Sequence, residues 1–283
     1  MTTKLILVEG LPGSGKSTTA QLVMDCVKEL GREGRLFMEG DVLHPADYEG
    51  TACLTEAQYE QLRSLCTGEE ADLVRRHATI HDGDFFLPYR QMEEQLGVRL
   101  SALAAEFIHK HDVYELPFTK NEHVIAAKWR RFVEEAADSQ TIYVFECCFI
   151  QNPVTVGMIK YDAPSNDVIA YVQQLDRIIA PLDPLLLYVK QPDLAHSFRK
   201  AVEERPTDWR DGFIDYYTKQ GYGAAHDYHG LDGTIEVLKA RAQLEEEMLG
   251  QLGVTIVIID NSTFDRELHK ERIARIVADY LAD

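Results

Sequence analysis

Four positions near the N-terminus have the spacing of a loop that binds a polyphosphate. Gly10 and Gly15 lie five residues apart, and Lys16 and Ser17 follow directly. Glycines permit a tight turn whose backbone N–H groups converge on an anion, while the lysine reaches the β- and γ-phosphates and the hydroxyl helps to hold Mg²⁺. This spacing predicts binding of a nucleoside triphosphate, taken here as ATP, together with Mg²⁺. The residues expected to contact them are Gly10, Leu11, Pro12, Gly13, Ser14, Gly15, Lys16, Ser17 and Thr18.

The segments on either side of the loop are those that a phosphate site requires. Residues 5–8 form an apolar run, which predicts a buried strand, and residues 18–30 have apolar side chains at three- and four-residue steps, which predicts a helix. A helix that begins at the loop adds the positive end of its dipole to the anion site. The four fixed positions recur by chance in roughly one chain in a hundred of this length. The flanking strand and helix therefore favour a P-loop over an accidental glycine-rich turn.

Two acids follow apolar runs that are expected to be parallel strands of one sheet. Asp41 comes after 35–38, and Glu146 comes after 141–145. The carboxyl ends of parallel strands meet at one edge of a sheet, on the side of the loop, so both acids should face the phosphates. Asp41 is the candidate to orient or deprotonate an acceptor hydroxyl, and Glu146 is the candidate partner of Ser17 at Mg²⁺ or a contact to the acceptor. The alternatives are a turn cap for Asp41 and a solvated strand end for Glu146, and the two acids could exchange roles.

Apolar runs alternate with helical patterns along the whole chain, which is typical of an α/β fold. We expect one P-loop NTPase domain over 1–283, in which a five-stranded parallel sheet is flanked by helices. Its core comprises 1–41 and 141–283. The strands are predicted at 4–9, 35–38, 141–145, 185–189 and 254–259.

An insertion of about a hundred residues, 42–140, separates the second and third predicted strands. It shows helical patterns and no strong strand pattern, and a structureless loop of that length would be improbable, so a helical subdomain that binds the acceptor is expected. Single histidines and tyrosines are more often structural than functional, which is the alternative for each candidate. The acceptor contacts predicted there are His44, Tyr48 and Arg90, with Glu146 and Gln151 added from the core.

A lid is predicted after the fourth strand, at about 199–231, because this stretch is rich in Tyr, Gly, Asp and His and has weak periodicity. Charge that develops on a transferred phosphoryl group needs a cation beyond Lys16 and Mg²⁺. Arg199 and Arg205 are the preferred candidates, ahead of Arg210. The alternatives are plain surface solvation or a helical ion pair such as Arg199 with Glu203.

The composition limits the class of partner. Asp and Glu total 47 against 29 Lys and Arg, which gives a formal charge of −18, and this charge would repel a nucleic-acid backbone. A small-molecule acceptor is therefore expected, with no nucleic acid as partner. The cysteines number 5 and lack CxxC spacing, so neither a disulfide framework nor a zinc site is predicted. Neither a signal peptide nor a membrane-spanning run is recognised, so a cytoplasmic protein is expected.

Taken together, the chain resembles the P-loop kinases of small molecules, the nucleoside and nucleotide kinase-like group that includes thymidylate, adenylate and gluconate kinases. The resemblance is specific at 10–18 and 40–45, and looser at 197–205 and 259–262. It implies transfer of the γ-phosphoryl group of ATP to a nucleoside, a nucleotide, a sugar acid or polyol, or an antibiotic hydroxyl. Asp41 with His44 is similar to the segment after the second strand of gluconate kinase, where an acid is expected to act on the attacking hydroxyl.

A nucleotide-switched regulatory protein, or a slow ATPase without an acceptor, is the alternative of a different class. A guanine-specific switch protein should carry an Asn-Lys-x-Asp motif after the fourth strand. The nearest stretch, 190–193, lacks the Asn-Lys pair. The long insertion and the lid favour transfer over switching, while the oligomeric state stays open.

Replacement of Lys16 by alanine tests the predicted phosphate loop. We expect Lys16→Ala to abolish tight ATP binding or turnover, because the ammonium group that reaches the β- and γ-phosphates is lost, and to leave the protein folded. Calorimetric titration with ATP and Mg²⁺, alongside circular dichroism, measures both. Unchanged ATP affinity and turnover would contradict the role of the loop.

Overall fold

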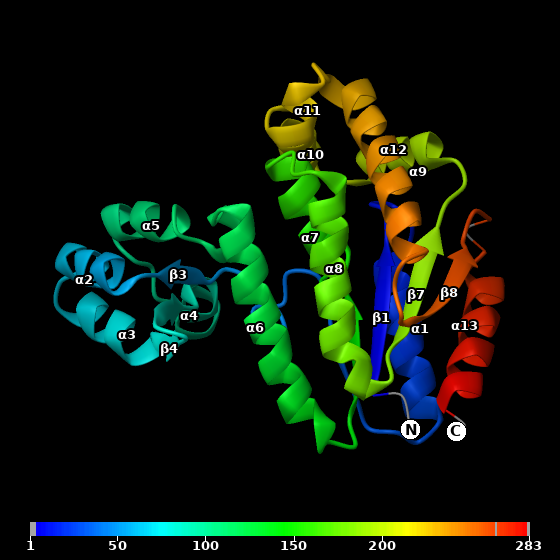
Figure 1. The fold of residues 1–283 in the computed structure, drawn as a ribbon, viewed down its shortest axis with the longest axis horizontal. Helices are drawn as coiled ribbons and strands as arrows, with labels where there is room; N and C mark the ends of the chain where they lie inside the picture. The colour runs from blue at the N-terminus through cyan, green and yellow to red at the C-terminus, as the bar shows by residue number, and fades with distance from the viewer. Residues whose placement is uncertain (1–3, 264, 282–283) are drawn as a thin grey trace. The chain divides into compact units, whose positions relative to one another are not determined.

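The structure is a computed structural model that describes residues 4–263 and 265–281 (Figure 1). It divides into two compact units, the first formed by Met1–Glu39 and Trp129–Asp283 and the second by Gly40–Lys128. The expected insertion, 42–140, therefore corresponds to a unit that ends earlier in the chain. The difference arises in helix α6, Phe118–Ala137, because its residues from Trp129 onward pack with the first unit.

The first unit is built on one sheet, and the prediction of a five-stranded, all-parallel sheet flanked by helices is confirmed. Its strand order is β2-β6-β1-β7-β8, so the strand before the glycine loop is central. The chain runs outward from β1 to β2 on one side and to β7 and β8 on the other. Ligands of such sheets bind at the carboxyl ends of the strands where the order reverses. The strands are β1 Leu5–Gly10, β2 Gly34–Phe37, β6 Ile142–Glu146, β7 Leu185–Lys190 and β8 Thr255–Asp260.

Helices connect these strands and cover the sheet. Within the described ranges, none of the helices combines the length and the apolarity that crossing a bilayer requires. The predicted lid region is helical: α9, α10, α11 and the start of α12 follow β7. Besides α6, the helices are α1 Lys16–Glu29, α7 Gln151–Val154, a π-helical segment Thr155–Lys160, α8 Ser165–Ile179, a 3₁₀ turn Ala180–Leu182, α9 Leu194–Glu204, α10 Thr207–Thr218, α11 Gly221–Ala225, α12 Gly230–Leu249 and α13 Arg266–Leu281.

Both faces of the sheet are buried, which explains why its strands read as continuous apolar runs. On one face, Ile6 and Val8 of β1 belong to a core cluster with Val23 of α1 and Val277 of α13, and Figure 1 shows these two helices side by side. On the other face the ring of the fully buried Trp129 lies 5.8 Å from that of Phe145 in β6. The carboxyl ends of β1 and β6 are thereby fixed from both sides.

The second unit contains a small sheet that the sequence did not lead us to expect. Its strands are antiparallel in the order β3-β5-β4 and have only three or four residues each, too few for a clear alternation. Asp82 and Gly83, both at positive φ, form the turn between β4 and β5, and Asp-Gly is the pair that a tight hairpin turn favours. The elements are β3 Ala52–Leu54, α2 Glu56–Leu65, α3 Glu69–His77, β4 Thr79–His81, β5 Asp84–Leu87, α4 Tyr89–Leu96, α5 Ala102–His109 and a 3₁₀ turn Val113–Glu115.

A buried ion pair joins α12 to the rest of the first unit. Arg241 and Glu245 are both fully buried, and Arg241 Nε donates to Glu245 Oε1 at 2.6 Å. The other carboxylate oxygen accepts from the Tyr188 hydroxyl of β7 at 2.6 Å, and Arg241 Nη1 donates to the Tyr217 hydroxyl of α10 at 2.8 Å. The pair therefore fixes α10, part of the predicted lid region, against β7 and α12.

The Arg241→Met substitution tests the energetic weight of this pair. It leaves the Glu245 carboxylate buried without its cation, so we expect the free energy of unfolding to fall by about 3–5 kcal/mol. Lys239→Met on the same helix removes a cation from an exposed pair with Glu236 and should change that energy by less than about 0.5 kcal/mol. Urea denaturation measures both, and equal losses would show that burial adds nothing.

Candidate functional site

The glycine loop opens onto a cavity of about 1020 Å³ in the first unit. Six of the nine residues predicted to bind nucleotide line it: Pro12, Gly13, Gly15, Lys16, Ser17 and Thr18. The rest of the wall comes from the carboxyl ends of β2 and β6, from the start of α7, and from α9 and α10. The parallel sheet thus brings together residues from segments that are far apart in the chain.

The loop has a conformation that only glycine fits at two of its positions. Gly10 has φ of 145°, and a Cβ there would lie 2.3 Å from the Val189 carbonyl oxygen of β7. Gly15 has φ of 97° and precedes α1, where a Cβ would lie 2.6 Å from Asn261 Nδ2. Among the described residues no side chain caps α1, and its first turn carries no acid. The first amides of α1 are therefore available to an anion.

Lys16 places a positive charge at this helix start. Its side chain is almost completely buried, and its ammonium group donates to the Leu11 carbonyl at 3.2 Å. Burial by itself lowers the pKa of Lys16, but the negative charges of Glu39 and Glu146 raise it, and the net shift is upward. The lysine is therefore held in its charged form, which is the form that binds phosphate.

A chain of hydrogen bonds connects the loop with the acids at the strand ends. Ser17 Oγ donates to Glu146 Oε1 at 2.6 Å, and the Glu39 amide donates to Glu146 Oε2 at 3.3 Å. Gln151 Nε2 in turn donates to Glu39 Oε1 at 2.7 Å. Glu146 is 2% exposed, whereas Glu39 is exposed and lines the cavity. Ser17 and Glu146, both predicted to lie at the metal, are thus in direct contact, while their role at Mg²⁺ stays a prediction.

The same acids could hold a cation. Oxygens of Glu39 and Glu146 and the sulfur of Cys147 lie within 4.8 Å of one another. Burial raises the pKa of the Cys147 thiol well above its usual range, so this group is a neutral thiol. The oxygens of Ser17, Glu39 and Glu146 then form a donor set of the kind that Mg²⁺ prefers.

The carboxylate of Glu9 holds the backbone of the segment that carries Gln151. Glu9, in β1, is 1% exposed, and its Oε1 accepts from the amides of Phe149 at 2.7 Å and Ile150 at 3.0 Å. Its Oε2 accepts from the Gln151 amide at 3.1 Å. Burial raises the pKa of Glu9 from 4.5 to about 7. The turn between β6 and α7 is therefore tied to β1 immediately before the glycine loop.

The predicted lid arginines lie in different surroundings. Arg205 lines the cavity, and its guanidinium lies 4.4 Å from the centre of the Trp209 ring. Arg199 forms an exposed ion pair with Asp232 of α12 at 2.6 Å, and Arg210 forms one with Asp211 at 2.8 Å. Only Arg205 of these three is part of the cavity wall, while a role for Arg199 stays a prediction.

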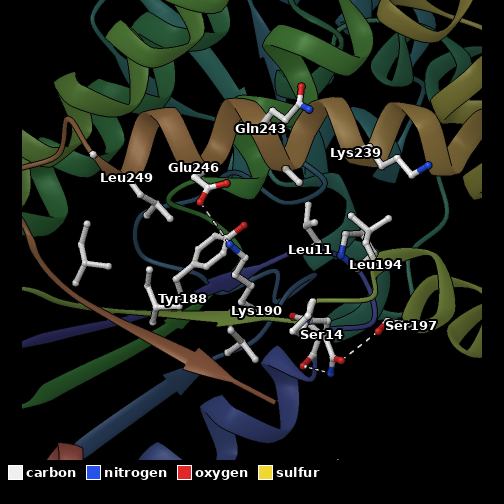
Figure 2. Close-up of a pocket in the computed structure, with 18 residues that line it drawn as sticks. Leu11, Ser14, Tyr188, Lys190, Leu194, Ser197, Lys239, Gln243, Glu246 and Leu249 are labelled. Carbon is white, nitrogen blue, oxygen red and sulfur yellow. Dashed lines mark hydrogen bonds and ion pairs between the residues drawn. The ribbon is translucent and has the colours of Figure 1, made fainter. Parts of the chain in front are cut away.

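A second, more apolar cavity of about 600 Å³ lies on the other side of the loop, between α12 and strands β7 and β8. Figure 2 shows Leu11 and Leu194 beside Tyr188 and the α12 side chains. Leu11 and Ser14, two of the residues predicted to bind nucleotide, line this cavity rather than the larger one. Its cations are Lys190, which is paired with Glu246 at 3.5 Å, and Lys239, which is paired with Glu236 at 2.7 Å. Both of these cations already have a carboxylate partner.

The remaining predicted residues belong to the second unit, where each has a structural partner. Asp41 Oδ1 accepts from the Leu43 amide at 2.8 Å, which is the turn-cap contact. His44 is buried, its Nδ1 accepts from the Ala46 amide, and burial with the charge of Lys128 lowers its pKa to about 3. The Tyr48 ring stacks on Phe86 with 4.7 Å between centroids, and Arg90 is paired with Glu49 and Glu94. Their roles toward an acceptor stay predictions.

Sequence reasoning missed Glu39, Glu9 and the aromatic wall of α10. The signal for Glu39 was its place immediately after the second apolar run, two residues closer to the strand than Asp41. Glu9 gave a weaker signal, an acid inside an apolar strand. The aromatic residues of α10 that line the cavity are Trp209, Phe213 and Tyr217. Their sequence pattern does not differ from that of a helix packed in a core, so the sequence carried no signal for them.

No protein-family model matches this chain, and no curated protein sequence matches it.

The pH dependence of stability tests the surroundings of Glu9. Because its pKa is raised on folding from 4.5 to about 7, the folded state keeps a proton between these values that the unfolded state has released. The contribution of Glu9 to the free energy of unfolding should therefore be greatest below pH 4.5 and fall by about 3 kcal/mol as the pH rises to about 7. Urea denaturation of the wild type and Glu9→Gln across this range measures the difference.

The exposed Glu29→Gln serves as the control for loss of one carboxylate. If the free energies of unfolding of the wild type and of Glu9→Gln differ by the same amount at every pH, the raised pKa of Glu9 would be contradicted.

Proposed function

We propose that the protein is an ATP- and Mg²⁺-dependent phosphotransferase, a P-loop kinase that transfers the γ-phosphoryl group to a small-molecule acceptor. The observation that carries the proposal is one cavity in which Lys16 and Ser17, at the uncapped start of α1, face the exposed carboxylate of Glu39. The parallel sheet with its glycine loop after the central strand supports assignment to the P-loop NTPase class.

The loop holds the donor by its phosphates. The first amides of α1 and the loop backbone bind the phosphate oxygens, and the buried, charged Lys16 reaches the β- and γ-phosphates. Ser17 and Glu146 are the residues that would hold Mg²⁺, which would neutralise part of the phosphate charge. Because Glu146 already binds the hydroxyl of Ser17, this pair is preorganised and needs little rearrangement when the donor binds.

Glu39 is the carboxylate that acts on the acceptor. As the acceptor oxygen bonds to the γ-phosphorus and the bond to the β–γ bridging oxygen breaks, the hydroxyl proton passes to Glu39 and ADP leaves. Gln151 holds this carboxylate at 2.7 Å, and the Glu39 amide is tied to Glu146. Arg205, on the α9–α10 side of the cavity, is the cation that stabilises the developing phosphoryl charge.

The cavity favours transfer over mere nucleotide binding. At about 1020 Å³ it extends beyond the loop to Gln151 and to α10, which leaves room for a second substrate beside a triphosphate. The cytoplasm is the proposed location, because the cysteines Cys26, Cys53, Cys66, Cys147 and Cys148 are free thiols, and a reducing compartment maintains thiols.

The proposal is tested by ADP release from ATP and Mg²⁺ with nucleosides, nucleotides, sugar acids, polyols and hydroxylated antibiotics as acceptors. One class should stimulate release strongly, and Lys16→Ala provides the blank. Tight ATP binding with no stimulation across all classes would instead indicate a regulatory protein or a slow ATPase.

The stimulated reaction separates Glu39 from Asp41. We expect Glu39→Gln to lower kcat by about a hundredfold or more with the KM for ATP unchanged, because the amide cannot take the acceptor proton. Asp41→Asn, measured in parallel, should stay near the wild type if Asp41 only caps its turn. If kcat falls strongly in Asp41→Asn and little in Glu39→Gln, Asp41 and not Glu39 would be the group that takes the proton of the acceptor hydroxyl.

A further inference from the structure

We infer that the apolar cavity between α12 and strands β7 and β8 is a second binding site, which takes a small, uncharged and largely apolar molecule and, when filled, tightens nucleotide binding at the glycine loop. Its volume of about 600 Å³ is within the usual range of small-molecule sites. Among the described residues, its wall includes none of the side chains to which the reaction was assigned. The effect on the nucleotide rests on the proposed function, because it requires a loop that binds phosphates.

The cavity arises from the face that α12 presents to the sheet. Ala242, at the middle of this face, is too short to fill the space down to Ile256 and Ile258 of β8, and all three line the cavity. The hydrogen bond of 2.6 Å between the Tyr188 hydroxyl of β7 and Glu245 of α12 holds helix and sheet apart. The residues of α12 that line the cavity recur at three- and four-residue steps, as on one helix face: Lys239, Ala242, Gln243, Glu246 and Leu249.

The wall of the cavity has apolar surface that a ligand can reach. Leu11, Leu194 and Leu249 are each half-buried, and Figure 2 shows them in the space between α12 and the strands. Ile256 is half-buried as well, and Ile258 is 52% exposed. Removing such surface from water is favourable. An apolar molecule that enters the cavity would therefore be stabilised by covering these side chains.

An uncharged molecule suits this wall better than an ion. The two lysines of the wall already have carboxylate partners, Glu246 for Lys190 at 3.5 Å and Glu236 for Lys239 at 2.7 Å. These pairs are exposed to water, where an additional charged group gains little from them. A charge placed among the leucines and isoleucines would lose its water, which costs free energy. The wall therefore favours a neutral ligand.

The cavity shares part of its wall with the glycine loop. Leu11, Pro12 and Ser14 belong to the loop and line the cavity. Gln191, also in the wall, donates from Nε2 to the Asn261 carbonyl at 2.8 Å and to the Ser14 carbonyl at 3.4 Å. Asn261 Nδ2 donates to the same Ser14 carbonyl at 2.9 Å. A molecule packed against Leu11 and Gln191 thus contacts the groups that hold the backbone of the loop.

The expected coupling between the two sites is positive. The structure contains the open cavity together with a loop and a start of α1 whose amides no described side chain caps. A ligand that binds this conformation stabilises it against others, so less free energy is needed to order the loop when phosphates bind. Linkage then requires that the nucleotide raise the affinity for the cavity ligand by the same factor.

Phenylnaphthylamine, an uncharged probe whose fluorescence rises in apolar surroundings, tests the site itself. Anilinonaphthalene sulfonate, which has the same rings and one added sulfonate, is the charged match. Each is titrated into the full-length protein. We expect one molecule of the neutral probe to bind per chain, at least about tenfold more tightly than the sulfonate binds in this cavity. No saturable binding of the neutral probe, or equal binding of both in the cavity, would overturn the inference.

The Ala242→Phe variant identifies the binding that belongs to the cavity. Its ring occupies the space beneath α12, so the affinity for the neutral probe should fall about tenfold or more. Ala225→Phe, at an exposed position of α11 outside both cavities, is the matched control and should bind like the wild type. Unchanged binding in a folded Ala242→Phe would place the probe elsewhere and overturn the inference.

Ile258→Thr supplies a second variant in case circular dichroism shows Ala242→Phe to be unfolded. Threonine keeps the branched side chain that suits a strand and makes the wall more polar. We expect it to stay folded and to weaken binding of the neutral probe about threefold or more. Binding as tight as in the wild type would overturn the inference in the same way.

The effect on the loop is measured with a non-hydrolysable ATP analogue and Mg²⁺. Calorimetric titration of the wild type with saturating phenylnaphthylamine should give a Kd for the analogue at least about fivefold lower than without it. The analogue should lower the Kd of the probe by the same factor, and the probe should have no such effect in Ala242→Phe. An unchanged Kd of the analogue in wild type that holds the probe would overturn the inference.

The inference and the proposed function fail in different ways. If the analogue binds neither with nor without the probe, the proposed function is contradicted and the effect on the loop falls with it, while the probe titrations still decide whether the cavity is a binding site. If the analogue binds and the cavity takes no probe, the inference is overturned and the kinase proposal stands.

Discussion

The hydrogen bond between Ser17 Oγ and Glu146 Oε1 is the contact on which the site depends. It joins residues that are 129 positions apart in the chain, at 2.6 Å. The parallel register makes it possible, because Glu146 at the end of β6 pairs with Val8 of β1, two residues before Gly10. The pairing of β1 with β6 therefore sets the positions of the glycine loop, the start of α1 and the carboxylate of Glu146. The other residues of the cavity lie around this contact.

Buried polar and charged side chains keep this arrangement rigid. Glu9 ties the segment after β6 to β1, and the Arg241–Glu245 pair ties α10 and α12 to β7. A buried charge without partners is costly, so each of these groups is stable only in the geometry that satisfies it. The exposed ion pairs of α9 and α10, such as Arg199 with Asp232, impose no comparable constraint. The loop and acids are thus the preorganised part of the site, and the surface of α9 is the part that can adjust.

The division of labour among the acids follows from where each strand ends. Glu146 is buried and bound to Ser17, which suits a role at the cation, whereas Glu39 is exposed to the cavity and held by Gln151, which suits a role at the acceptor. Asp41 lies two residues beyond Glu39 and serves its own turn. Since a strand directs only its last residues toward the edge of the sheet, a shift of two positions changes which carboxylate faces the loop.

The sequence by itself determined the parallel sheet, the glycine loop with Lys16 and Ser17, and the position of Glu146, because long buried strands and glycine turns leave local signals that do not depend on distant residues. Helices such as α3, at Glu69–His77, were also predictable from periodicity. Only the tertiary structure decided the short hairpin of the second unit, the exposure of Glu39 to the cavity, the hydrogen bonds of Glu9 and the unpartnered oxygen of Gln151. Each of these depends on which distant atoms come within hydrogen-bonding distance, and that is set by the packing of the whole sheet rather than by any local pattern.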